Sequence, residues 1–156
     1  MKKIKLAKGK FALVDDEDYD WLNQWKWYAN KIGHTYYVYH AQRIGKKILK
    51  YAIHRIIMRP PFNMQVDHID HNGLNNQKSN LRICNSAQNQ MNQLKKNKYK
   101  GVYIEKRCNK NLIRACIKIN YTLRYLGYFK TEKEAAMAYN EAAKNLFGEF
   151  ANLNIL

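Results

Sequence analysis

The feature that most restricts the fold of this chain is the run of residues 66–90, VDHIDHNGLNNQKSNLRICNSAQNQ, which places two Asp-His pairs and six asparagines in 25 positions. The segment MQVDHI predicts a strand, and Asn72-Gly73 predicts a tight turn in the loop that follows it. NLRIC predicts a returning strand, and SAQNQMNQ predicts a short helix that Ser86 caps. We therefore expect a β-hairpin followed directly by a helix.

The same run carries the groups that phosphodiester hydrolysis requires, which are a base that takes a proton from water and ligands for a cation. A helix that follows a hairpin starts beside the end of the first strand, so Asp67 and Asn89 could meet at one cation. Carboxylate and amide oxygens are hard ligands, which favours Mg²⁺ or Mn²⁺. His68, whose side chain titrates near neutrality, would be the general base.

Two alternatives stay open on this pattern. Adjacent residues of a strand point to opposite faces, so Asp67 and His68 share a site only where the chain twists or leaves the strand. The second pair, Asp70 and His71, satisfies the same composition. An asparagine-rich loop can also be purely structural, with Asx-turns that use up its side chains.

The net charge of the chain indicates the class of its partner. Lys and Arg number 28 against 12 Asp and Glu, a net charge of +16, which predicts a polyanionic partner. Nucleic acid is favoured over a membrane, because no run approaches the roughly eighteen apolar residues of a spanning helix. The alternative is a solvated basic surface that binds nothing.

The N-terminal sequence and the cysteines indicate the cellular compartment of the protein. The opening MKKIKLAKGK has no apolar run after its basic residues, so we do not expect a signal peptide. Cys84, Cys108 and Cys116 form no CxxC pair and predict reduced thiols. We expect a cytoplasmic protein.

Pattern and charge divide the chain into three parts, 1–59, 60–97 and 98–156, whose net charges are +8, +2 and +6. In the first part KFALV and TYYVYHAQR predict strands, and DDEDYDWLNQWKW predicts a short helix. RPPF stiffens the entry to the middle part, and LKKNKYK predicts a basic linker that leaves it. We expect the first part to be a β-rich module that contacts DNA. Its aromatic residues should be core, with stacking on bases as the alternative; they are Trp21, Trp25, Tyr37 and Tyr39.

The last part has the most regular pattern. GVYIEK, LIRACIKI and LRYLGYF predict three strands, and the segment after them predicts a helix. Thr131 should be the N-cap of this helix, Glu134 should close a capping box, and Gly148 should end it. The expected core stripe of the helix is Ala135, Tyr139, Ala142 and Leu146.

Alternation along the second of these strands gives it a polar and an apolar side. Arg114, Cys116 and Lys118 share one side, and isoleucines and an alanine occupy the other. The apolar side should pack on the Ala-rich helix, which leaves the polar side for DNA.

Residues 66–90 closely resemble the HNH motif of phage and intron-encoded homing endonucleases, which are ββα-metal nucleases. That motif has Asp-His, an asparagine twelve residues after the histidine and an Asn or His twenty-one residues after it, which here are Asp67-His68, Asn80 and Asn89. The resemblance favours the pair 67/68 and implies that His68 is the general base. It implies that Asp67 and Asn89 hold the metal and that Asn80 braces the loop that orients His68.

Residues 98–156 resemble the APETALA-type (ethylene-response-factor) DNA-binding domain through YKGVYIEK, RACIKI, YLGYFKTEKEAAMAYNEAA and FGEFANLN. In that family one face of a three-stranded sheet enters the major groove of DNA. Glu105 stands where the family often has arginine, and Tyr125 stands where it has tryptophan. The residues that the resemblance assigns to DNA contact are Lys100, Tyr103, Arg107, Arg114, Lys118 and Tyr125.

Together these observations predict an α+β protein with an N-terminal β-rich module, a central ββα-metal HNH motif and a C-terminal three-stranded antiparallel sheet on one helix. The expected function is metal-dependent, sequence-targeted cleavage of double-stranded DNA, by nicking or by a double-strand break. We expect a monomer on DNA rather than a dimer, no membrane and no small-molecule cofactor. The alternatives are a non-catalytic DNA-binding regulator with a relic HNH scaffold and a binder of structured RNA.

Overall fold

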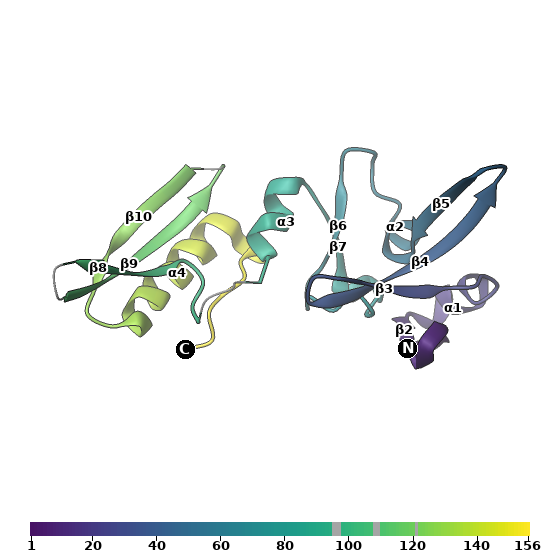
Figure 1. Ribbon diagram of the computed structural model, residues 1–156, viewed down its shortest axis with the longest axis horizontal. Coiled ribbons are helices and arrows are strands. Elements are labelled where there is room, and N and C mark those ends of the chain that lie inside the picture. Colours follow the sequence, from purple (N-terminus) through teal and green to yellow (C-terminus); the bar gives the residue numbers. More distant parts are fainter. Residues whose placement is uncertain (95–97, 108–109, 121) are drawn as a thin grey trace. The chain divides into compact units, whose positions relative to one another are not determined.

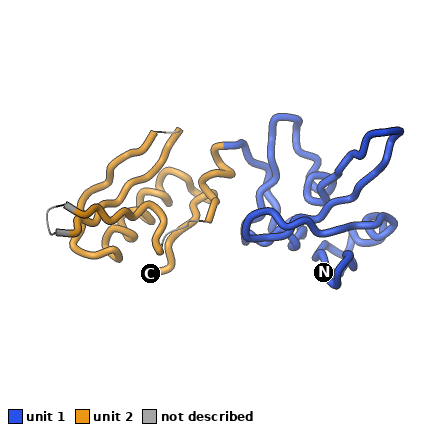
Figure 2. The backbone as a smooth tube through the Cα atoms, viewed as in Figure 1, with its two compact units in different colours: residues 1–86 blue, residues 87–156 orange. Residues whose placement is uncertain are grey.

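In the computed structural model, which describes residues 1–94, 98–107, 110–120 and 122–156, the chain is a mixed α+β protein of small antiparallel sheets and helices (Figure 1). The predicted mixture of strands and helices is confirmed. The chain forms two compact units, Met1–Ser86 and Ala87–Leu156 (Figure 2). The division into three parts, with a boundary after residue 59, stays a prediction.

The first unit contains three sheets, formed by β1-β2, β3-β4-β5 and β6-β7. Its core draws on nearly every element, because Ile4, Val14, Leu22, Val38 and Ile53 pack together in one buried cluster. The elements are β1 (Lys2–Lys5), β2 (Phe11–Val14), α1 (Asp16–Leu22), β3 (Tyr28–Ile32), β4 (Thr35–Ile44), β5 (Lys47–Ala52), α2 (Ile53–Met58), β6 (Gln65–His68) and β7 (Leu81–Cys84), with short 3-10 turns at Ala7–Gly9 and Lys78–Asn80.

The helix predicted for DDEDYDWLNQWKW is shorter than expected. α1 ends at Leu22, and the chain then turns so that the buried Trp27 indole donates a hydrogen bond to the Leu22 carbonyl oxygen at 2.8 Å. The expectation that Trp25 lies in the core is wrong, because this side chain is 41% exposed. Trp21, Tyr37 and Tyr39 are half-buried.

The loop between β6 and β7 is fastened to the N-terminal part of the unit. Leu13 in β2 exchanges backbone hydrogen bonds with it, to the Leu74 carbonyl and from the Asn76 amide, each at 2.8 Å. The carboxylate of Asp15 accepts a hydrogen bond from the Lys78 amide at 2.7 Å. Contacts between residues some sixty positions apart therefore hold this loop in place.

The second unit contains α3 (Ser86–Asn92), β8 (Val102–Arg107), β9 (Lys110–Ile119), β10 (Thr122–Phe129), α4 (Glu132–Phe147) and a 3-10 turn at Gly148–Phe150. α3 begins at the last residue of the first unit. The three strands form an antiparallel sheet in the order β10-β9-β8, as predicted for this region.

The sheet of the second unit packs on α4 through the predicted face of β9. Ala115 and Ile117 lie in the buried clusters that α4 forms with its alanines and with Tyr139. The predicted capping box at Thr131 and the helix end at Gly148 are confirmed. Gly148 has φ +53°, a conformation that favours glycine.

The predicted core stripe of α4 needs correction. Leu146 is exposed, whereas Ala136, Ala143 and Phe147 are buried with Ala135 and Tyr139. The helix is therefore rotated slightly relative to the predicted stripe.

Two other expectations concern the whole chain. Cys84 and Cys116 are buried free thiols, and Cys108 lies outside the described residues. No helix in the described part of the chain is long and apolar enough to cross a membrane.

Candidate active site

The hairpin of β6 and β7 carries the central residues of the candidate site. Its register sets Asp67 opposite Arg82 and His68 opposite Leu81. Asp67 and His68 are only 7% and 4% exposed, so both neighbours on this strand are covered by protein. Their surroundings differ, because Asp67 meets Arg82 across the hairpin whereas His68 meets rings from β4 and α2.

His68 is held by a hydrogen bond and by two rings. Its Nε2 lies 3.3 Å from Oδ1 of Asn76, and the rings of Tyr37 and His54 meet it edge to face with centroids at 5.6 and 5.1 Å. Asn76 is fully buried, and its Nδ2 donates to the Gly73 carbonyl, so its Oδ1 must face the histidine as an acceptor. Nε2 of His68 therefore carries the proton in the neutral ring, and Nδ1 carries the lone pair.

The protonation of both histidines follows from their burial. Loss of water lowers the pKa of His68, although the hydrogen bond to Asn76 and the nearby Asp70 and Asp67 act in the opposite direction. Loss of water, with the charges of His68 and Arg55 in addition, lowers the pKa of His54 to about 3. Two neutral imidazoles therefore lie side by side at neutral pH, which suits a group that accepts a proton.

The second Asp-His pair belongs to the turn. Oδ1 of Asp70 accepts hydrogen bonds from the Asn72 amide at 2.8 Å and from Asn80 Nδ2 at 2.9 Å, and Oδ2 accepts one from Asn75 Nδ2 at 2.9 Å. Burial would raise the pKa of Asp70, but these hydrogen bonds together lower it. His71 has φ +62°, a turn conformation. The structure therefore distinguishes the pair Asp67-His68, which is buried on β6, from the pair Asp70-His71, which shapes the loop.

Asn80 lies at the end of the 3-10 turn and bonds back across the loop. Its Nδ2 donates to Asp70 Oδ1 and to the Asn75 carbonyl, both at 2.9 Å, and its Oδ1 accepts from the Asp70 amide at 3.0 Å. Its backbone carbonyl accepts from the Ile69 amide, one residue after His68. This asparagine therefore closes the loop that starts at His68.

Asp67 is the acidic group of the site. Arg82 donates to its Oδ2 from Nε at 3.0 Å and from Nη2 at 2.8 Å. A carboxylate suits a hard divalent cation, so the donor chemistry of Asp67 fits Mg²⁺ or Mn²⁺. Among the described residues no group of three or more His, Cys, Asp and Glu side chains is placed to hold a metal ion. Asn89, the other expected ligand, lies on α3 in the second unit.

The expected DNA-contacting face lies on the outer side of the sheet in the second unit. Register places Tyr103, Arg114 and Tyr128 in a row across the three strands. The Arg114 guanidinium lies 5.6 Å from the centre of the Tyr103 ring and 3.9 Å from the Glu105 carboxylate. Tyr125 is 55% exposed and packs edge to face on Tyr128 with ring centroids 5.3 Å apart.

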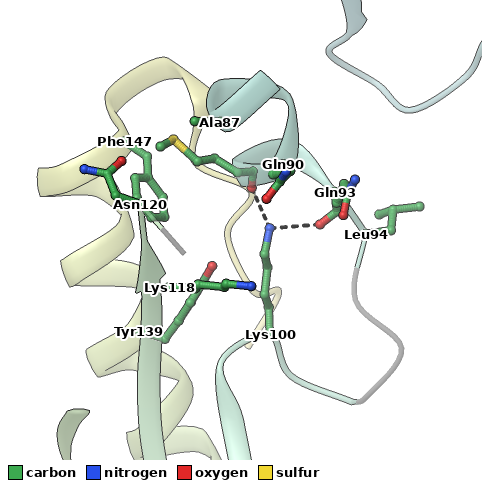
Figure 3. Close-up of a pocket in the computed structure, with 10 residues that line it drawn as sticks. Ala87, Gln90, Gln93, Leu94, Lys100, Lys118, Asn120, Tyr139 and Phe147 are labelled. Carbon is green, nitrogen blue, oxygen red and sulfur yellow. Dashed lines mark hydrogen bonds between the residues drawn. The ribbon is translucent and has the colours of Figure 1, made fainter. Parts of the chain in front are cut away.

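Three other residues were expected to contact DNA, and two of them lie elsewhere in this unit. The side chain of Arg107 lies outside the described residues. Lys100 and Lys118 line a pocket of this unit, where the Lys118 side chain points toward Lys100 (Figure 3). The Lys100 ammonium donates to the carbonyls of Met91 at 2.5 Å and Gln93 at 2.8 Å, at the end of α3. Favourable pairing of a cation with the last carbonyls of a helix gives Lys100 a structural role as well.

Sequence reasoning missed three residues of the first unit that surround the site, namely Arg82, Asn76 and the ring of Tyr37. The sequence signal for Arg82 is weak, because the long loop between His68 and Leu81 prevents the register of the hairpin from being deduced from the sequence. Tyr37 lies on β4, far from the motif in sequence, and nothing in the local pattern indicates its contact with His68.

The chain is 36% identical over 150 residues to an uncharacterised HNH endonuclease of Acanthamoeba polyphaga mimivirus. The match covers 95% of this chain and 76% of that protein. No family model matches the chain. No solved structure matches it either.

Proposed function

Because the chain belongs to the HNH endonuclease family, we propose that it is a metal-dependent, sequence-targeted DNA endonuclease of the homing type. The observation that carries the proposal is the buried, neutral His68 beside Asp67 at the end of β6. A neutral imidazole can accept a proton, and the uncharged hydrogen-bond partner holds its ring in one orientation. A histidine in a solvated loop has no such fixed orientation. The substrate would be double-stranded DNA, bound by a monomer.

In the proposed mechanism His68 is the general base. Its Nε2–H donates to Asn76 Oδ1, so Nδ1 is the nitrogen that takes a proton from the attacking water. The rings of Tyr37 and His54 pack edge to face on the imidazole and help to hold its orientation. The hydroxide equivalent attacks phosphorus in line with the departing 3′ oxygen, and the P–O3′ bond breaks. One site of this kind cuts one strand, so a double-strand break requires a second event.

Asp67 and Asn89 are the residues that would hold a divalent cation, Mg²⁺ or Mn²⁺. When bound, such a cation supplies positive charge that stabilises the phosphate and the departing oxygen. The carboxylate of Asp67 is a hard donor already fixed in orientation by Arg82. Asn89 would add an amide oxygen from α3.

Asn80 has a positioning role in this proposal. Its Nδ2 donates hydrogen bonds to both Asp70 and the Asn75 carbonyl, so the loop that carries Asn76 keeps one conformation. Because Asn76 sets the tautomer of His68, the contacts of Asn80 support the orientation of the base.

We assign target recognition to the second unit, as an APETALA-type domain of the kind that the sequence resembles. Tyr103, Arg114 and Tyr125 on the outer face of the sheet would contact DNA. We assign the same role to Arg107, the last residue of β8. Arg114 is suited to a guanine edge because guanidinium binds O6 and N7 as a pair. Lys100 and Lys118 would hold phosphates.

The experiment that tests the proposal is conversion of supercoiled DNA, carrying the gene and its flanking sequence, to nicked or linear form. Reactions with Mg²⁺, with Mn²⁺ and with a chelator test metal dependence. Asp67→Ala and Asn89→Ala should each abolish product or raise the metal concentration needed for it at least tenfold. Gln88→Ala, on the same helix as Asn89, is the matched control and should leave the metal requirement unchanged. Cleavage that persists in the chelator would contradict the proposal.

A further inference from the structure

The hairpin of β4 and β5 has no partner in the first unit over most of its length. β3 pairs with β4 only up to Tyr39, and beyond that point β4 pairs with β5 alone, from Ala41 opposite Lys50 to Ile44 opposite Lys47. Every residue from 41 to 51 is exposed. Figure 1 shows the two strands running together to a turn away from the other sheets of the unit. We call residues 41–51 the ribbon.

The composition of the ribbon indicates the chemistry of its partner. It carries four basic side chains, Arg43, Lys46, Lys47 and Lys50, and no acidic one. It also exposes large apolar side chains, Ile44 by 54%, Ile48 by 63% and Leu49 by 41%. A two-stranded hairpin is only marginally stable alone in water, and exposed apolar groups mark an interaction surface. The excess of positive charge favours an anionic partner.

Aromatic rings form a rigid base for one face of the ribbon. Trp25 stacks on His40 with ring centroids 5.6 Å apart, and His40 stacks on Tyr51 at 6.4 Å. Nδ1 of His40 donates to the Lys26 carbonyl at 3.0 Å, which fixes the central ring. Trp25 and Tyr51 remain 41% and 36% exposed. Because His40 and Tyr51 are opposite each other in the register, their face continues along the ribbon through Gln42 and Leu49.

Both strands of the ribbon lead directly to the candidate base. Tyr37 on β4 meets the His68 ring, and so does His54 in α2, which follows β5 without a loop. A partner that binds the ribbon is therefore held at a fixed distance from His68. This connection distinguishes the ribbon from a basic surface that only raises the local concentration of DNA.

We propose that the ribbon enters a groove of duplex DNA and fixes the distance between the bound bases and the cut. The major groove admits a two-stranded β-ribbon, and the four basic side chains would contact phosphates on either side of it. From Tyr37 to Ile44 the strand is roughly 23 Å long at about 3.3 Å per residue. That length corresponds to roughly seven base pairs at about 3.4 Å each, so the cut lies within about that distance of the bases under the ribbon tip. The inference rests on the proposed function, because it takes DNA as the partner.

The test compares two triple variants with the unaltered protein in duplex DNA binding, with a chelator present so that no strand is cut. Arg43→Ala/Lys47→Ala/Lys50→Ala removes three charges from the ribbon. Lys3→Ala/Lys5→Ala/Lys31→Ala removes three exposed charges from β1 and β3 of the same unit. All six positions are exposed, so both variants should keep the fold, which circular dichroism checks.

We expect the ribbon variant to lose at least tenfold in affinity and to flatten the slope of log K against log salt by about 0.9 for each phosphate that it no longer neutralises. The control variant should stay within about threefold. Footprinting should show weaker protection within about seven base pairs of the cut. Equal losses in the two triple variants, or a stronger effect on single-stranded than on duplex DNA, would overturn this inference alone. Absence of salt-sensitive DNA binding by the unaltered protein would overturn both it and the proposed function.

Discussion

The guanidinium of Arg82 binds one oxygen of the Asp67 carboxylate twice, with Nη2 and Nε at 2.8 and 3.0 Å from Oδ2. Both side chains are nearly buried, at 10% and 8% exposure. The pair joins the two strands of the hairpin beside the candidate base. Two charges removed from water in this way depend on each other, because either one alone would be left without a counter-ion.

Arg82→Gln should therefore destabilise the protein strongly, because it leaves the Asp67 carboxylate buried without its counter-ion. We expect a loss of about 3 to 5 kcal/mol in the free energy of unfolding, measured with urea. The double variant Asp67→Asn/Arg82→Gln should recover a large part of that loss. A single-variant loss below about 1 kcal/mol would mean that water reaches the carboxylate and that the pair is not a buried one.

His54 should make stability depend on pH. Burial lowers its pKa from 6.5 to about 3 in the folded protein. As the pH falls from 6.5 toward 3, the unfolded chain takes up a proton that the folded protein does not, so stability decreases. The expected slope from this group is about 1.4 kcal/mol per pH unit.

His54→Gln should remove that slope, and urea unfolding at pH 7 and pH 5 measures the difference. The matched control is His34→Asn in the exposed turn before β4, because this side chain does not lose its water on folding. If His54→Gln and the unaltered protein lose equal stability between the two pH values, His54 is not buried in its neutral form.

Asn80 allows a prediction of which of two substitutions destabilises the protein more. Asn80→Ala removes the three side-chain hydrogen bonds that close the loop. Asn80→Asp keeps the acceptor for the Asp70 amide but sets a second carboxylate against Asp70 Oδ1. We therefore expect Asn80→Asp to be less stable than Asn80→Ala by about 1 kcal/mol or more near pH 7. Thermal unfolding tests this order, and the reverse order would show that Asp70 is not the partner of Asn80.

Much of the fold could be predicted from local pattern, and the failures have physical causes. The elements of residues 101–148 follow from alternation, a capping box and a terminal glycine, all of which are local signals. β5, the second strand of the ribbon, escaped prediction because both of its faces are exposed, so burial imposes no alternation on it. The contact of Leu13 with the loop at Leu74 and Asn76 is invisible in sequence, because it depends on packing between distant segments.

The candidate site was predictable only in part for the same reason. Composition left Asp67-His68 and Asp70-His71 as equal candidates, and the structure separates them by burial and backbone conformation. The residue pattern suggested the roles of Asp67, His68 and Asn89, whereas the resemblance favoured the pair 67/68 and added the role of Asn80. These roles stay predictions.

Glu105 provides a test of the DNA-contacting face. Its carboxylate lies 3.9 Å from the Arg114 guanidinium and repels phosphate. Glu105→Gln should tighten duplex binding by about threefold to tenfold, with the largest gain at low salt. Glu141→Gln is the matched control, because it removes the same charge from the exposed side of α4, which covers the opposite face of the sheet. Equal effects of the two variants would place the DNA elsewhere.

The most direct test of the account compares His68→Ala with His71→Ala in metal-dependent cleavage and in duplex binding. The two histidines are three residues apart and each follows an aspartate, but only His68 is buried on a strand and bonded to Asn76. We predict that His68→Ala lowers the cleavage rate at least a thousandfold, as expected for loss of a general base with its orienting contacts, and that its DNA affinity stays within about threefold. His71→Ala should cut DNA at nearly the original rate. Equal activity of the two variants, or a parallel loss of cleavage and binding in His68→Ala, would contradict the assignment of His68 as the base.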